Sequence, residues 1–234
     1  MSPDGTILAS AGYDGSIRLW EVDSVGFLRS LSGHGDRLPA NSSEPQSLNW
    51  VAQVAFHPTG TELGSVGYDG TVRVWDPRTG EGRLLRSFGY ELISLAYGPD
   101  GSRLAVAERT GEIHVLDSVT GEIVQTLDAV SGPPTGLVFS ADGGLVAGAG
   151  PGHFAHVWDM DTGRLVRRIH GSVYAPTGVA FIDDGDQLLA LATEGVLRRY
   201  LLDPVELVEL ARQEVSRDLT EEECRRYLRR SCEG

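Results

Sequence analysis

Apolar and polar residues alternate in short segments, which Gly-containing turns separate along most of the chain. In residues 71–75, for example, Val72 and Val74 alternate with polar side chains, and a turn at 68–70 precedes them. Segments of four to seven residues with this period of two are typical of antiparallel strands joined in hairpins. Because the turns are closely spaced, no helix fits between them, and we predict an all-β fold for residues 1–202.

A repeat of about 42 residues organises these segments. A turn motif that ends in Asp-Gly or Thr-Gly has its second residue at positions 3, 58, 99, 141 and 183, and an aromatic or apolar residue recurs at positions 20, 75, 116, 158 and 200. Both series advance by 55, 41, 42 and 42 residues, so two unrelated positions keep one period, which indicates a true repeat. The longer first step indicates an inserted loop at Gly35–Asn49. We place the units at about 1–49, 50–91, 92–133, 134–175 and 176–202.

Each full unit contains four predicted strands, whereas the first and last units are incomplete. Met1 falls in the turn after a first strand, which leaves three predicted strands in the first unit. Residues 195–201 form a third predicted strand and the Asp203-Pro204 pair then begins a helix, so the last unit also has three. We expect 18 strands where five full units need 20, in an open or strained assembly that self-associates through the incomplete first unit.

Trp-Asp pairs end the third predicted strand of the second and fourth units, and a Gly-His pair precedes the second unit's strands. The two exact Trp-Asp pairs are Trp75-Asp76 and Trp158-Asp159. At the equivalent positions of the other units, Trp20-Glu21 and Leu116-Asp117 are near matches and Tyr200-Leu201 is a degenerate one. The Gly-His pair is Gly33-His34. With its repeat length, the chain therefore resembles the WD40 family of β-propellers over residues 2–202. The resemblance implies a β-propeller of four-stranded, WD40-like units and says little about function.

The last segment, residues 203–234, predicts two short α-helices. Asp203 is a suitable N-cap with Pro204 at the first helical position, and Thr220 with Glu223 forms a capping box for the second helix. This tail is similar to the one that closes many bacterial WD40 proteins, which often carry an N-terminal kinase or STAND-type NTPase. The resemblance leaves open that the chain is a C-terminal sensor part of a larger regulator, without an independent function.

Composition narrows the possible partners and chemistry. A net charge of −13 makes nucleic acids and anionic membranes poor partners. All 20 basic residues are Arg, and without Lys the chain cannot perform P-loop ATPase, protein kinase or Schiff-base chemistry alone. We expect no cofactor.

The preference for Arg over Lys indicates a bacterial genome. The lack of a visible signal sequence indicates a cytoplasmic protein, in which Cys224 and Cys232 are expected to be free thiols.

The WD40 resemblance implies a structural tetrad in the second unit. Its members are His34, Ser65, Asp69 and Trp75. In the family these side chains hydrogen-bond to one another inside a blade, so their expected role is structural and not catalytic. The first unit keeps Ser10, Asp14 and Trp20 at three of these positions, and the third unit has Thr110 at the Asp position, which breaks its tetrad.

No catalytic or metal site is expected. The enzyme alternative, a propeller hydrolase acting in the central channel, needs acid–base groups there, but the innermost predicted strands contain no Asp, Glu, His or Cys. These strands are 51–56, 92–97, 135–139 and 177–181. His153 and His156 lie three apart on a predicted strand and so point to opposite faces, which prevents them from sharing an ion.

A protein or peptide is the expected partner. In WD40 proteins the residue before the tetrad Asp faces the top surface, and residues that enter the first strand of a blade join it there. The predicted partner-binding residues are Tyr13, Trp50, Tyr68, Tyr90, Glu91 and Arg109. Aromatic residues and Arg dominate protein interfaces, which favours a non-catalytic interaction or scaffold module.

Overall fold

The protein is represented by a computed structural model that describes residues 1–35, 49–150, 154–170, 176–192 and 195–203. The chain divides into two compact units, Met1–Tyr200 and Leu201–Gly234. The helices predicted for the tail lie outside the described residues. Within the described residues, no helix is both long enough and apolar enough to span a lipid bilayer.

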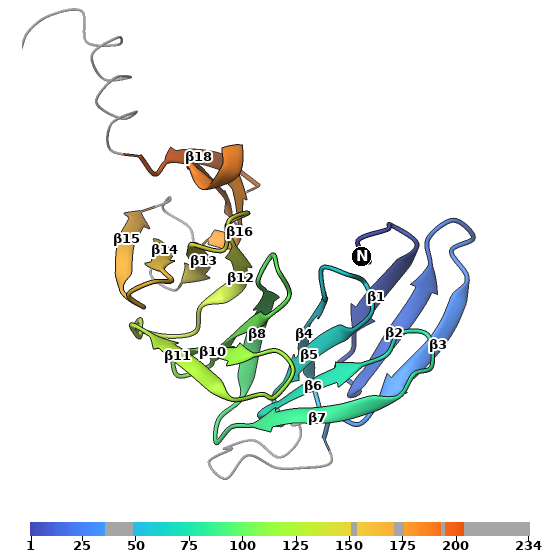
Figure 1. The fold of residues 1–234 in the computed structure, drawn as a ribbon. Coiled ribbons are helices and arrows are strands. Elements are labelled where there is room, and N and C mark those ends of the chain that lie inside the picture. The colour runs from blue at the N-terminus through green and yellow to red at the C-terminus, as the bar shows by residue number, and fades with distance from the viewer. Residues whose placement is uncertain (36–48, 151–153, 171–175, 193–194, 204–234) are drawn as a thin grey trace, which may run out of the picture. The chain divides into compact units, whose positions relative to one another are not determined.

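Eighteen strands in five antiparallel sheets make up most of the described part of the chain (Figure 1). The first sheet contains β1 (Ile7–Ala11), β2 (Ser16–Glu21) and β3 (Phe27–Ser32); the second contains β4 (Val51–Phe56), β5 (Leu63–Gly67), β6 (Thr71–Trp75) and β7 (Gly82–Ser87). The third contains β8 (Leu92–Tyr97), β9 (Arg103–Glu108), β10 (Ile113–Asp117) and β11 (Ile123–Leu127); the fourth contains β12 (Thr135–Phe139), β13 (Leu145–Gly150), β14 (Phe154–Asp159) and β15 (Leu165–His170). The fifth contains β16 (Pro176–Ile182), β17 (Gln187–Ala192) and β18 (Leu197–Leu201), with a 3₁₀ turn, η1 (Asp183–Gly185), after β16.

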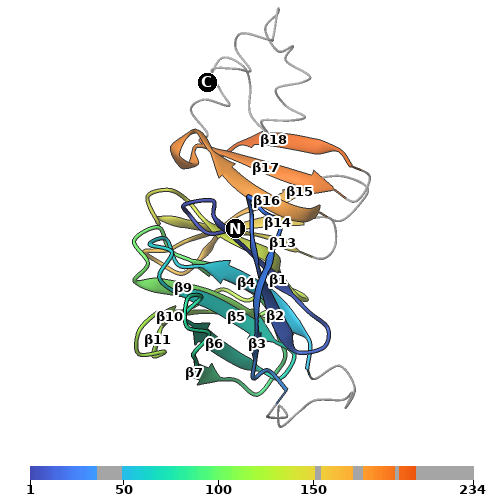
Figure 2. The same ribbon diagram turned by 90° about the vertical axis from the view of Figure 1, so that its right-hand side faces the viewer.

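This architecture confirms the predicted all-β fold of five repeated units. Strands that are neighbours in a sheet are also neighbours in the sequence, so every sheet is an antiparallel meander. Among the described residues, the first and last sheets have three strands and the other three sheets have four, as the sequence predicts. Figure 2 shows the fifth sheet, in orange, as three adjacent strands.

The recurring turn motif has Gly at its end because of backbone geometry. Gly60 and Gly101 have φ angles of 74° and 76°, in the left-handed region that residues with a side chain disfavour. Their N–H groups donate to the carbonyl oxygens of His57 (2.8 Å) and Gly98 (2.9 Å). The motif therefore marks the tight turn between the first and second strands of a full unit.

The hydrophobic core lies between consecutive sheets. Three clusters of buried side chains join the first sheet to the second, the second to the third, and the third to the fourth. Each cluster has members from both of its sheets: Ile17 and Leu63 in the first, Val72 and Leu95 in the second, and Ile113 and Val146 in the third. The inner strands of the fourth and fifth sheets, β12 and β16, are also in contact. Each sheet thus buries its apolar face against the next one along the chain.

Central strands are buried on both faces as a result. In β6, Val72 faces the core and is 0% exposed, while Thr71 on the other face is only 1% exposed. The Thr71 hydroxyl donates to Asp69 Oδ1 at 2.9 Å. The polar face that the alternation predicts therefore meets a buried hydrogen-bond network and not solvent.

Candidate functional site

The four tetrad residues form one hydrogen-bonded network in the second sheet. His34, in the loop after β3, brings Nδ1 to 3.0 Å from Asp69 Oδ1 and Nε2 to 2.7 Å from Ser65 Oγ. The Trp75 indole N–H donates to the same Ser65 oxygen at 2.8 Å. The hairpin sets this geometry, because Ser65 and Trp75 lie on the paired strands β5 and β6 and Asp69 lies in the turn that joins them.

Asp69 is a buried carboxylate whose charge this network compensates. The side chains of Asp69 and His34 both have an exposed fraction of 0%. Burial alone raises the pKa of Asp69, but the hydrogen bond and charge of His34 lower it. Further hydrogen bonds from Gly35 and Thr71 bring the pKa of this carboxyl below its ordinary value. Since no ligand can reach side chains buried this deeply, the network is suited to stabilising the blade.

The same positions are used differently in other units. In the first unit, Trp20 Nε1 donates to Ser10 Oγ at 3.1 Å, while the Asp14 side chain is 53% exposed. In the fourth unit, Trp158 is fully buried and its Nε1 donates to the carbonyl oxygen of Asp128 at 2.9 Å. Within the described residues, the complete four-membered network therefore occurs in the second unit.

A row of aromatic rings that ends in an arginine crosses the turns of the first three sheets. The ring centroids of Tyr13 and Trp50 are 4.5 Å apart, and those of Trp50 and Tyr68 are 5.3 Å apart. The guanidinium carbon of Arg109 lies 5.7 Å from the centre of the Tyr68 ring. Trp50 immediately precedes β4, and the other three residues lie in the β1–β2, β5–β6 and β9–β10 turns. Four of the six predicted partner-binding residues are thus brought together.

These four residues line a pocket of about 330 Å³, which we name the aromatic pocket. Its other lining residues are Ala52, Ile93, Pro133 and Thr135. All eight residues occupy one of three positions within the repeat, and residues at the same position are separated by the same steps as the turn motif. The first position supplies Tyr13, Tyr68 and Arg109, the second supplies Trp50 and Pro133, and the third supplies Ala52, Ile93 and Thr135. Successive units therefore build one pocket by contributing the same positions.

Main-chain hydrogen bonds hold the lining turns in place. The N–H of Tyr68 donates to the carbonyl oxygen of Trp50, and the N–H of Arg109 donates to that of Glu91, both at 2.9 Å. The side chains of Glu91 and Tyr90 are not among the lining residues, and Tyr90 is 41% exposed. Glu91 thus supports the aromatic pocket through its backbone.

Four lining residues of the aromatic pocket were not predicted from the sequence: Ala52, Ile93, Pro133 and Thr135. Pro133 occupies in the fourth unit the position that Trp50 has in the second, so extending that position by one unit predicts it. Ala52, Ile93 and Thr135 lie on the inner strands β4, β8 and β12, and nothing in their residue types distinguishes a binding surface from a packed core. Most of the inserted loop, 36–48, lies outside the described residues.

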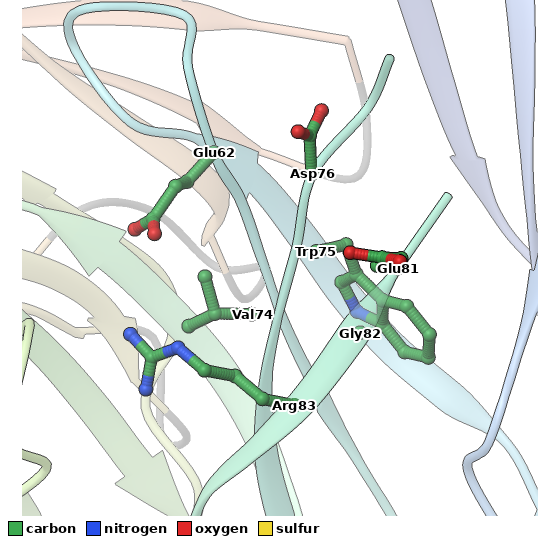
Figure 3. A pocket seen from close by; sticks show the side chains of 7 residues that line it. All are labelled: Glu62, Val74, Trp75, Asp76, Glu81, Gly82 and Arg83. Carbon is green, nitrogen blue, oxygen red and sulfur yellow. The ribbon is translucent and has the colours of Figure 1, made fainter. Parts of the chain in front are cut away.

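A second pocket, of about 280 Å³, lies beside the β6–β7 hairpin (Figure 3). Its lining residues are Glu62, Val74, Trp75, Asp76, Glu81, Gly82 and Arg83. Figure 3 shows Trp75 beside Gly82, where a Cβ atom would lie 2.2 Å from Trp75 Cε3. The Asp76 carboxylate accepts the N–H of Arg78 at 2.7 Å and so belongs to the turn. This pocket reflects how the hairpin accommodates the Trp75 ring.

Sequence comparisons relate the chain to known proteins. The family model "WD domain, G-beta repeat" matches residues 1–21 and 26–76, and the model "Anaphase-promoting complex subunit 4 WD40 domain" matches residues 86–142. Coronin-7 of Mus musculus is 38% identical over 112 residues, which are 47% of this chain and 12% of that protein. Coronin-7 of Homo sapiens is 34% identical over 131 residues, 55% of this chain and 13% of that protein. Protein groucho of Drosophila melanogaster is 30% identical over 116 residues, 50% of this chain and 14% of that protein.

The chain spans about one eighth of the length of these curated relatives. The two family models describe WD40 domains and together match more than half of the chain. The antiparallel four-stranded meanders have the topology of propeller blades. The chain belongs to the WD40 repeat family.

Proposed function

We propose that this chain is a non-catalytic protein-interaction module that binds a peptide segment of a partner protein in the aromatic pocket. The observation that carries the proposal is the row Tyr13, Trp50, Tyr68 and Arg109, which lines one pocket from three successive units. Trp, Tyr and Arg are the residue types most enriched among binding hot spots. A volume of about 330 Å³ suits one or two side chains of a partner.

The chemistry of the lining favours binding over catalysis. Among the lining residues there is no Asp, Glu, His or Cys that could act as a general acid, base or nucleophile. Arg109 supplies a positive charge beside three aromatic rings. The partner segment is therefore expected to place a carboxylate near Arg109 and an apolar side chain against the rings.

The proposal keeps two broader inferences from the sequence. A bacterial source agrees with the lysine-free composition, while the relatives reported above come from animals. A role as the sensor part of a larger regulator is compatible with the same pocket, because a sensor also needs a surface that binds a partner.

Peptide binding tests the proposal. We would select peptides from a displayed library on the purified chain and measure synthetic versions by fluorescence anisotropy. The double variant Tyr68→Ala, Arg109→Ala is expected to weaken binding by roughly 30-fold or more, since a hot-spot truncation costs about 2 kcal/mol or more. Binding should also weaken with salt, because one contact is an ion pair.

A matched control uses the same residue types outside the aromatic pocket. The double variant Arg78→Ala, Tyr90→Ala removes two exposed side chains that do not line it. Its peptide affinities should equal those of the parent. Selected peptides that bind the Tyr68→Ala, Arg109→Ala variant as tightly as the parent would contradict the proposal.

We also propose that the chain can self-associate through its first sheet. Within the described residues β1 pairs with β2 alone, which leaves its other edge open to a strand from a second copy. Leu8 on β1 is 47% exposed. Sedimentation velocity should detect a concentration-dependent dimer that Leu8→Lys weakens, because a charged side chain blocks edge pairing. A parent chain that remains monomeric at high concentration contradicts this proposal.

A further inference from the structure

A cluster of three potential metal ligands lies in the third sheet, apart from both pockets. Glu108 ends β9, Glu112 lies in the following turn and His114 lies on β10. The N–H of Glu108 donates to the carbonyl oxygen of Glu112 at 2.8 Å, so these two residues face each other across the hairpin. The side chain of His114 lies on the same side, because its Nε2 atom is within 4 Å of a carboxylate oxygen of each glutamate. The hairpin thus brings all three side chains to one face.

The turn that makes this arrangement possible needs a glycine. Gly111 has a φ of 106°, and a Cβ atom there would lie 2.1 Å from the carbonyl oxygen of Val130. No other residue fits this backbone without displacing the chain at Val130. The spacing of Glu108, Glu112 and His114 is therefore fixed by the backbone and not by flexible side chains alone.

The ligand atoms are close enough to share one ion. His114 Nε2 lies 3.3 Å from Glu108 Oε1 and 3.6 Å from Glu112 Oε2, and one atom from each residue lies within 4.8 Å of the other two. In a tetrahedral zinc site with bonds of about 2.0–2.2 Å, ligand atoms lie roughly 3.3–3.6 Å apart. The side chains of Glu108 and His114 are 6% and 10% exposed, whereas that of Glu112 is 56% exposed. The cluster is thus buried on one side and open to water on the other.

The remaining polar atoms of the two buried ligands already have partners. Thr126 Oγ1 lies 3.2 Å from His114 Nδ1, and the Thr110 hydroxyl donates to Glu108 Oε2 at 2.9 Å. The Phe88 ring stacks on His114 with centroids 5.1 Å apart. When Nδ1–H donates to Thr126, the lone pair of Nε2 points toward the two carboxylates, where a cation would offset the repulsion. Metal-binding His and carboxylate side chains are commonly oriented by such outer hydrogen bonds.

Comparison with the second unit indicates why this site differs from the tetrad. A side chain at Gly67 would approach His34 Nδ1 to 2.8 Å, so that unit needs a glycine there. The third unit has Glu108 at the equivalent position, 41 residues later, and has lost the tetrad Asp to Thr110. In place of the tetrad, the third unit thus has a cluster with two carboxylates and one imidazole, which is a metal-binding composition.

We propose that Glu108, Glu112 and His114 bind one divalent transition-metal ion, with Zn²⁺ as the best match and water as the fourth ligand. Imidazole nitrogen favours zinc over magnesium or calcium, and carboxylate oxygens complete its tetrahedral set. The site does not depend on the proposed peptide-binding function, since none of its three ligands lines the aromatic pocket.

Zinc binding to the full chain tests the proposal. The protein is prepared without an affinity tag, treated with a chelator and carries Cys224→Ser and Cys232→Ser, because thiolates also bind zinc. Isothermal titration should give one equivalent of Zn²⁺ per chain, and Co²⁺ should give the intense visible absorption of a tetrahedral site. His114→Gln should abolish binding, and Thr126→Val should weaken it by roughly 10- to 100-fold.

Glu112→Gln provides the decisive variant, because the Glu112 side chain is 56% exposed and its replacement is expected to leave folding unchanged. It should weaken zinc binding at least tenfold with an unaltered melting temperature. The control variants His57→Gln and Glu62→Gln change the same residue types outside the cluster and should bind zinc like the parent. Absence of stoichiometric binding by the parent, or equal affinity of Glu112→Gln and the parent, overturns the proposal and leaves His114 as the partner of a plain ion pair.

Discussion

Replacing Asp69 with alanine is expected to lower the free energy of unfolding by roughly 1–3 kcal/mol or more, because buried donors then lose their acceptor. His34 and the N–H of Gly35 both lie against the Asp69 carboxylate, and the Thr71 hydroxyl also donates to it. The side chains of Asp69 and His34 are both 0% exposed, so bulk solvent does not reach the donors that lose their acceptor. Urea denaturation followed by circular dichroism at pH 7 measures the loss.

Asp14→Ala is the matched control for this variant. Asp14 occupies the same position in the turn of the first unit, but its side chain is 53% exposed, so its loss should cost much less. The dependence of the free energy of unfolding on pH provides a second test of the role of Asp69. Because the pKa of Asp69 is lowered in the folded state, its stabilisation is present above the ordinary value of 3.8 and is lost as the pH falls through the folded-state value. Equal losses for the two variants at pH 7 would show that the tetrad is not a stabilising network.

Trp158→Ala should be more destabilising still, by about 3–5 kcal/mol, because it empties a large, fully buried site between the third and fourth sheets. The change also leaves the carbonyl oxygen of Asp128 without the indole N–H that lies 2.9 Å away. Thermal melting of the parent and the variant provides the measurement, with a clear fall in the melting temperature as the expected result.

Trp20→Ala tests whether burial or the repeat position causes this effect. Trp20 has the equivalent position in the first unit, but it is half-buried and packs edge-on against Phe27. Its removal should cost distinctly less than that of Trp158. If both variants lose the same stability, the position in the repeat matters more than the amount of buried area.

The repeat made most of the fold predictable from the sequence. Gly60 and Gly101 mark turns because their φ angles are positive, and this local requirement is visible in one residue type. Two markers with one period then fix how many sheets form and which positions are equivalent. The tetrad could be anticipated because the chain resembles the WD40 family, in which the positions of His34, Ser65, Asp69 and Trp75 carry such a network.

Features that depend on contact between strands could not be predicted in the same way. The cluster of Glu108, Glu112 and His114 forms because of the register of the β9–β10 hairpin, and the spacing of these residues in the sequence does not reveal it. The polar face of β6 is another example, because Thr71 is buried by the neighbouring network and its residue type does not reveal this. The tail at 204–234 lies outside the described residues, and its predicted helices stay predictions.

The way the aromatic pocket is assembled has a consequence for how such a protein can change over generations. Tyr68 and Arg109 are held by main-chain hydrogen bonds to Trp50 and Glu91, which do not depend on the side chains at these positions. A point mutation there alters what the pocket contacts while the blades keep their framework. Duplicating one unit adds another residue at each of these repeat positions, with the same main-chain framework around it. New specificities can thus arise by copying and diversifying units, without inventing a new site.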